Sequence, residues 1–133
     1  MREAEIEIHT GNERVMDVTD RVAGFVSQGG DGLLNVFVPH ATAGVAIMET
    51  GSGSEADLVE ALERIFPRDS RYRHSHGSPG HGADHVLPAL VSPSVTIPVR
   101  QGRLGLGTWQ RIVLVDLNQD NPDRRIQLSF LAG

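Results

Sequence analysis

Short apolar runs recur along the chain and limit it to a fold built mainly of β-strands. In residues 4–8, 95–99 and 126–130, apolar side chains alternate with polar ones, which is the two-residue period of a strand with one face in water. Residues 33–38 and 112–117 are almost continuously apolar and rich in branched side chains, as is typical of strands. Residues that favour turns separate these runs. The sequence therefore predicts seven or eight short strands.

Three other segments have the spacing of helices. From Thr19, apolar residues recur every three or four positions until a pair of glycines. Ser54 is predicted to cap the clearest helix, which Pro67 ends and whose apolar face is expected to cover a sheet. Asp84 is predicted to cap a short helix over residues 85–90. Together these elements predict an α+β domain, mainly an antiparallel β-sandwich, with two or three short helices.

The composition narrows the functional classes. With 133 residues and 39% apolar content, the chain is expected to form one domain, residues 1–133. A formal net charge of −5 argues against nucleic-acid binding, which depends on basic surfaces. Because there is no cysteine, a metal site must use His, Asp or Glu. No apolar run is long enough for a membrane helix and the first residues do not resemble a signal peptide, so we expect a cytoplasmic protein without membrane contacts.

Four of the six histidines lie within twelve positions, at His74, His76, His81 and His85. The surrounding segment is rich in glycine and poor in apolar side chains, so it is not a core element. Histidine titrates near neutral pH and is the commonest metal ligand. We therefore predict an active-site or metal-site loop, with disorder as the alternative for a structureless stretch of this length. His81 and His85 have the i, i+4 spacing that aligns two imidazoles on a helix, but Gly80 and Gly82 argue against a helix there. His76 is expected to be a solvated loop residue.

Two further polar residues follow apolar runs. His40 comes shortly after residues 33–38, and Glu49 comes directly after residues 45–48. The short connection between these runs predicts that the two residues lie on neighbouring strands. Glu49 would then be a general base, a metal ligand or a partner that orients a histidine, or else only the solvent-exposed end of a strand.

The segment SVTIPVRQGRLGLGTWQRI, residues 94–112, resembles the signature of the YjbQ family, which is also catalogued as an uncharacterised family and as secondary thiamine-phosphate synthases. The similarity rests on a serine, spaced aliphatic residues, a glycine and the string G-T-W-Q at residues 107–110. The family pattern H-x-T-A is matched at His40, Thr42 and Ala43, and His85 is similar to a family histidine that precedes a short helix. The resemblance covers nearly the whole chain, but the additional histidines before His85 leave the ligand set open.

The resemblance implies a homotrimeric, jelly-roll β-sandwich with thiamine-phosphate synthase-like activity. The enzyme would join hydroxymethylpyrimidine diphosphate to thiazole phosphate and release pyrophosphate, and a divalent metal, Zn²⁺ or Mg²⁺, would neutralise the leaving diphosphate. Metal ligands are expected among His40, His74, His81 and His85. Catalytic roles are expected for His40, Glu49 and Gln110. Contacts to a phosphorylated substrate are expected from Thr42, Arg73, Thr108 and Trp109.

Two other functions use the same residues. One is a non-catalytic protein that binds a metal or an anionic metabolite, and the other is a metal-dependent hydrolase of a phosphorylated small molecule. Trp109, the only tryptophan, is expected to be a buried structural ring if it is not a pocket wall.

Overall fold

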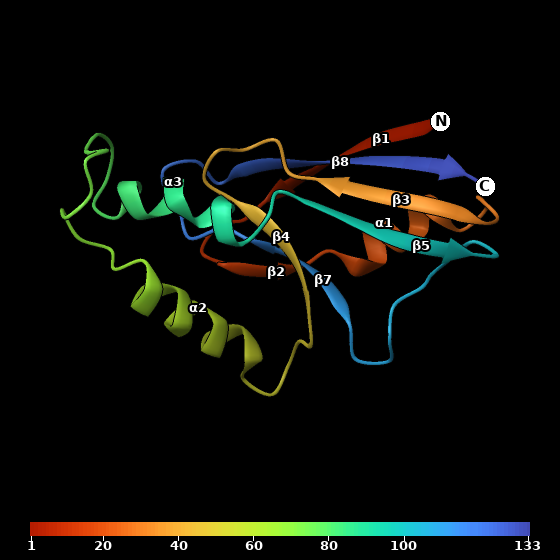
Figure 1. Ribbon diagram of the computed structural model, residues 1–133, viewed down its shortest axis with the longest axis horizontal. Helices are drawn as coiled ribbons and strands as arrows, with labels where there is room; N and C mark the ends of the chain where they lie inside the picture. Colours follow the sequence, from red (N-terminus) through yellow and green to blue (C-terminus); the bar gives the residue numbers. More distant parts are fainter.

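Two antiparallel sheets packed face to face form the framework of the computed structural model, which describes residues 1–133 (Figure 1). The larger sheet contains, in spatial order, β1 (Arg2–His9), β8 (Asp123–Ala132), β3 (Gly32–Phe37), β5 (Ser94–Arg100) and β6 (Arg103–Leu104). The smaller sheet contains β2 (Val15–Asp17), β7 (Arg111–Val115) and β4 (Gly44–Met48). This arrangement confirms the predicted α+β fold with an antiparallel β-sandwich.

The main core lies between the two sheets and follows from the alternation in the sequence. In β8, Ile126, Leu128 and Phe130 are at most 3% exposed, while the residues between them are more exposed. The register places Leu128 opposite Val36 of β3, so the apolar faces of neighbouring strands coincide. Burying each large apolar side chain of this kind contributes about 1.5–3 kcal/mol. The predicted α1 (Thr19–Val26) is present and packs into the same core.

A second core lies on the other face of the smaller sheet. Here α2 (Ser54–Ile65) and α3 (His81–Leu90) pack against β7, whose Val113 and Val115 are fully buried. Because β7 contacts one core on each face, its apolar residues are continuous rather than alternating. Figure 1 shows both helices at one end of the molecule, with residues 66–80 joining them at the tip. The expectation that α2 covers a sheet is thus confirmed.

Two local predictions are wrong. Ser54 is the first helical residue of α2 and makes no capping bond; the cap position is Gly53, in the left-handed conformation with φ +91°. The neighbouring strands predicted for His40 and Glu49 also do not exist, because β3 and β4 belong to different sheets. The short segment between them crosses from one sheet to the other instead of closing a hairpin. None of the three helices has the length and apolar character needed to cross a membrane.

Candidate metal site

The helix α3 begins at His81, four residues earlier than predicted. Gly80 occupies its N-terminal cap position with φ +90°, a left-handed conformation that glycine adopts without strain, so this glycine starts the helix instead of breaking it. His81 and His85 therefore lie one turn apart on the same helical face. Their Nε2 atoms are 2.9 Å apart. The prediction that Gly80 and Gly82 argue against a helix at His81 and His85 is therefore wrong.

The second glycine, Gly82, is required by a close approach of the preceding loop. A Cβ atom at this position would lie 2.6 Å from Cβ of Tyr72 and 2.8 Å from the carbonyl oxygen of His74. Tyr72 itself packs against the second core. The absence of a side chain at Gly82 thus lets the loop bring His74 over the first turn of α3.

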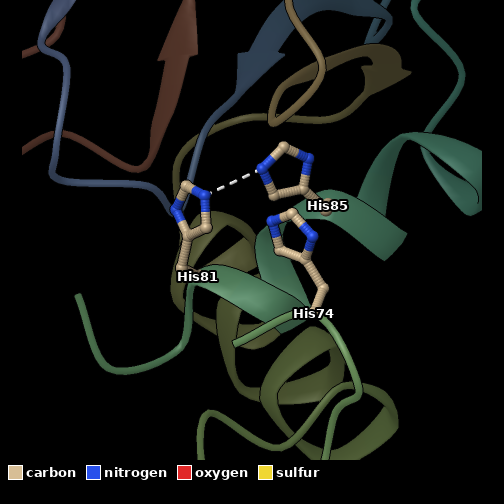
Figure 2. Close-up of side chains that lie close together, drawn as sticks. All are labelled: His74, His81 and His85. Carbon is tan, nitrogen blue, oxygen red and sulfur yellow. Dashed lines mark hydrogen bonds between the residues drawn. The ribbon is translucent and has the colours of Figure 1, made fainter. Parts of the chain in front are cut away.

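Three imidazoles converge at this point (Figure 2). One ring nitrogen each from His74, His81 and His85 lies within 4.8 Å of the other two, and these three residues are called the imidazole triad below. The ring centroids of His74 and His85 are 4.3 Å apart. His76 is exposed, but its ring lies against the triad, with centroids 4.1 Å from His74 and 4.7 Å from His81.

The triad fits a tetrahedral metal ion with nitrogen ligands. Two nitrogens that are each about 2.0–2.1 Å from zinc at tetrahedral angles lie roughly 3.3 Å apart. The Nε2 atoms of His81 and His85 are 2.9 Å apart, and a ring nitrogen of His74, on an exposed loop, lies within 4.8 Å of both residues' ligand atoms. Three neutral imidazoles are a donor set suited to zinc and poorly suited to magnesium, which prefers oxygen.

The environment keeps these rings in the form that binds metals. Loss of hydration lowers the pKa of His85, and the neighbouring imidazoles His74 and His81 lower it further, because a second positive charge nearby is unfavourable. Loss of hydration also lowers the pKa of His74, and its neighbours His76 and His81 lower it further. Both rings are therefore held neutral at physiological pH, with a lone pair available for coordination.

Beneath the triad lies a buried ion pair that the sequence did not indicate. Asp84, predicted to be a helix cap, is inside the first turn of α3 and only 1% exposed. Its carboxylate accepts two hydrogen bonds from the guanidinium of Arg68 and one, 3.0 Å long, from the side-chain amide of Asn118. The carboxylate therefore links α3 to the loop after α2, through Arg68, and to the connection after β7, through Asn118.

A second buried ion pair joins Arg124 to Asp116. The two ion pairs, together with Asn118 and Thr42, are called the polar layer below. Arg124 Nε donates to Asp116 across 2.6 Å, and its Nη2 donates to Asp116 across 3.2 Å and to the hydroxyl of Thr42 across 2.9 Å. Asp116 also accepts the backbone N–H of Asn118 at 3.0 Å. Asp116 is a charged residue within an apolar run, and this was the one signal in the sequence that could have revealed the network. Thr42, predicted to contact substrate, is 8% exposed and takes part in this layer.

His40 lies outside the triad. Its Nε2 accepts the backbone N–H of Arg125 at 3.0 Å, and burial lowers its pKa, with Arg124 and Arg125 adding to the effect. It lines a separate cavity of about 470 Å³ together with Glu5, Glu7 and His9. A single chain thus does not join His40 to the other three predicted ligands, and its role stays a prediction.

The G-T-W-Q turn also lies away from the triad. Figure 1 shows the connection from β5 to β7 well apart from α3, and Thr108 and Gln110 line a cavity of about 450 Å³ beside α1. Gln110 accepts the backbone N–H of Gly107 at 2.7 Å, which closes the turn. Trp109 is 72% exposed, so the expectation of a buried ring is wrong. Glu49 and Arg73 are also exposed, and the functions predicted for these residues are not tested by their positions.

Comparison with known proteins identifies relatives over almost the full chain. A family model described as "UPF0047 protein YjbQ-like" matches residues 4–133. A UPF0047 protein of Mycobacterium bovis is 63% identical over 128 residues, which cover 96% of this chain and 99% of that protein. A UPF0047 protein of Archaeoglobus fulgidus is 36% identical over 111 residues, covering 84% and 85%.

Solved structures agree with the fold. A hypothetical protein of Aeropyrum pernix, 32% identical, covers 100% of both chains with a TM-score of 0.90. A protein of Sulfolobus solfataricus, described as YbjQ-like and of unknown function, has a TM-score of 0.92 at 25% identity and covers 99% of this chain and 97% of its own.

Proposed function

Because this chain belongs to the YjbQ-like UPF0047 family and gathers three imidazoles in one place, we propose that it binds zinc through His74, His81 and His85. The observation that carries this proposal is the convergence of three ring nitrogens within 4.8 Å. Two of the rings have lowered pKa values, which favours the neutral ligand form. The imidazole donors make zinc the better candidate of the two metals considered, since magnesium is bound mainly by oxygen.

Three protein ligands are typical of catalytic zinc sites, in which a fourth position is left for water or substrate. A zinc ion there would supply positive charge to a phosphate oxygen or lower the pKa of a bound water. The adjoining cavity of about 270 Å³ is lined by hydroxyl-bearing residues, glycines, the carboxylate residue Asp69, and three histidines, His74, His76 and His81. Hydroxyl and backbone N–H groups of this kind are suited to hold a phosphorylated small molecule.

The activity we propose first is the thiamine-phosphate synthase reaction that the family resemblance implies. The C–O bond between the pyrimidine methylene and the diphosphate breaks, and pyrophosphate leaves with the bonding electrons. The thiazole nitrogen supplies the electron pair for the new C–N bond. The chain's contribution would be to hold the metal with three imidazoles and to position the phosphate against the glycine-rich loop, with the exposed Arg73, the residue before His74 in sequence, as a candidate phosphate contact.

The size of the cavity favours a second candidate. At about 270 Å³ it lies just below the usual range of roughly 300–1,000 Å³ for ligand pockets, which favours one small substrate over two. Hydrolysis of a single phosphorylated small molecule needs only that molecule and a water. We therefore propose metal-dependent phosphate hydrolysis as the alternative activity.

Zinc content and turnover test these proposals together. The purified chain is stripped with a chelator, reloaded with zinc and analysed by mass spectrometry for bound metal. We expect one zinc per chain, lost in His81→Ala and His85→Ala and retained in His9→Ala, whose exposed ring pairs with Asp123 outside the triad. His40→Ala, measured in parallel, tests whether that residue is a ligand.

The reaction products then separate the activities. Pyrophosphate formed only when both thiamine precursors are present supports the synthase, and phosphate released from one substrate alone supports the hydrolase. Full zinc occupancy with neither product points to a non-catalytic binding protein. A wild-type chain that takes up no zinc refutes the metal site.

We also propose the homotrimer that the resemblance implies. The supporting feature is apolar surface on the larger sheet, where Leu33 of β3 lies opposite Leu131 of β8 and the two side chains are 48% and 57% exposed. Exposed apolar pairs of this kind favour association between protein surfaces. Sedimentation equilibrium should give three chain masses, whereas a stable single-chain mass at micromolar concentration contradicts the trimer.

A further inference from the structure

The connection between β7 and β8, residues 116–122, brings a carboxylate against the imidazole triad. Oδ2 of Asp120 lies 3.2 Å from Nδ1 of His81. An ionised carboxylate only accepts hydrogen bonds, so Nδ1 must carry the proton and donate it. The other ring nitrogen, Nε2, is then the one with a free lone pair. It is also the atom that lies 2.9 Å from Nε2 of His85, at the centre of the triad.

A competing partner would favour the opposite tautomer. The side-chain nitrogen of Asn118 lies 3.3 Å from the same Nδ1 of His81. If this amide donated to Nδ1, the ring proton would sit on Nε2 and block coordination. The orientation of Asn118 is fixed, because its Oδ1 accepts the backbone N–H of Asp120 at 2.9 Å and its amide nitrogen donates one N–H to Asp84 at 3.0 Å. Only the second N–H of the amide is left to compete for Nδ1.

The bond to the carboxylate is also the stronger of the two. A charged acceptor strengthens a hydrogen bond roughly twofold over a neutral pair. The second N–H of Asn118 would make a neutral bond to Nδ1 of His81 at 3.3 Å, whereas the carboxylate of Asp120 lies 3.2 Å away and carries charge, so Asp120 is the favoured partner. With Nδ1 protonated, only one proton is needed between the two Nε2 atoms. In the metal-free chain His85 supplies it from its Nε2–H, and for Nε2 of His85 to bind a metal this proton moves to Nδ1 of the same ring.

The position of Asp120 is fixed by the layer beneath it. Its backbone N–H is held by Asn118, whose own backbone N–H donates to the buried Asp116. The carboxylate of Asp120 also accepts the backbone N–H of Ser78, 3.4 Å away, in the loop that precedes α3. The side chain is 38% exposed, yet its carboxylate bonds to the loop before α3 and its backbone bonds to Asn118.

We propose that Asp120 is a positioning residue that holds His81 in its Nδ1–H tautomer and so prepares Nε2 for the metal. This inference rests on the proposed zinc site. A carboxylate behind a ligating histidine fixes the orientation of the ring and raises its basicity, and removal of such a partner typically weakens metal binding 10- to 100-fold. Sequence patterns do not reveal this role, because Asp120 lies in a polar turn that resembles an ordinary connection.

Zinc affinity, measured by competition with a chromophoric chelator, tests the inference. Asp120→Ala removes the acceptor, and Asp120→Asn can present an N–H to Nδ1 and stabilise the other tautomer. We expect both variants to bind zinc about 10- to 100-fold more weakly than wild type. Asp123→Ala is the matched control, because it removes the same charge from an exposed position nearby and should stay within about twofold.

Two further measurements separate positioning from a general loss of structure. The thermal unfolding of the metal-free Asp120 variants should match wild type to within a few degrees, since the side chain is partly exposed. Cobalt substituted for zinc should show a changed visible absorption spectrum in these variants. Wild-type zinc affinity in both Asp120 variants overturns the inference, as does an equal loss in Asp123→Ala. Failure of the wild-type chain to bind zinc refutes the metal site itself and is therefore a distinct result.

Discussion

Replacing Asp84 by alanine should reveal how strongly the site depends on buried charge. Asp84 is 1% exposed, and its removal leaves the guanidinium of Arg68 without its partner and Asn118 without its acceptor. Breaking a fully buried pair in this way costs about 3–5 kcal/mol. Because the side chain of Arg68 is 22% exposed, water will replace part of the lost interaction. We therefore expect a loss of about 3 kcal/mol in the free energy of unfolding.

Urea denaturation followed by far-ultraviolet circular dichroism measures this loss. Trp109 is a poor fluorescent probe because its ring is already in water. With a slope of about 2 kcal/mol per molar urea, the midpoint should fall by roughly 1.5 M. Asp69→Ala removes an exposed pair with Arg71 from the same loop and should leave the midpoint unchanged. A midpoint shift below about 0.5 M for Asp84→Ala would refute the structural role assigned to the pair.

The double variant sharpens this prediction. Arg68→Met combined with Asp84→Ala leaves no unpaired charge in the second core, so it should be at least as stable as Asp84→Ala alone. If the two losses instead simply add, the residues do not act as a pair, and the polar layer beneath the triad is not an interacting unit.

Two other outcomes follow from the geometry of the site. Without metal, the chain should lose stability as the pH falls below about 6.5, because His40, His74 and His85 have lowered pKa values and the unfolded chain therefore binds protons that the folded chain does not. Urea midpoints measured in chelator should fall with pH over this range. An equally steep fall in His85→Ala would show that His85 is not a cause of the pH dependence. Gly82→Ala should displace the loop that carries His74 and weaken zinc binding, because the new Cβ would lie 2.6 Å from Tyr72. Gly24→Ala on α1 is the control and should bind zinc normally, since its Cβ would have nothing within 4 Å. Equal zinc affinities in the two variants would show that the contact at Gly82 does not position the loop.

The sandwich could be predicted from the sequence because each strand carries its own pattern. The alternation in residues 4–8 and 126–130 became β1 and β8, which pair directly along the whole of β1. What the patterns do not contain is the assignment of strands to sheets. The segment between His40 and Gly44 has the length of a hairpin, yet β3 pairs with β5 and β8 in one sheet, whereas β4 pairs with β7 in the other.

The site was predicted in part. The density of histidines between His74 and His85 correctly located a cluster, but its order depends on glycines whose roles are not local. Gly80 is needed for a left-handed cap, and Gly82 is needed because another segment passes over it. Asp84 and Asn118 find their partners across 16 and 34 residues of sequence, a separation at which neither spacing nor periodicity carries information.

Order in the loop that carries His74, between α2 and α3, must come from charge more than from apolar packing. Between α2 and α3 only Phe66 and Tyr72 join the second core, and apart from two prolines the remaining side chains are polar or, at the glycines, absent. Arg68 ties the start of this loop to Asp84, and Ser78 ties its end to Asp120. Asp84 also accepts a hydrogen bond from the amide of Asn118, and Asp120 also contacts His81. The loop therefore cannot detach without disturbing the histidines. The affinity of the triad for metal and the stability of this end of the molecule are therefore coupled, and zinc should protect the backbone of residues 68–80 from hydrogen exchange more than it protects the strands.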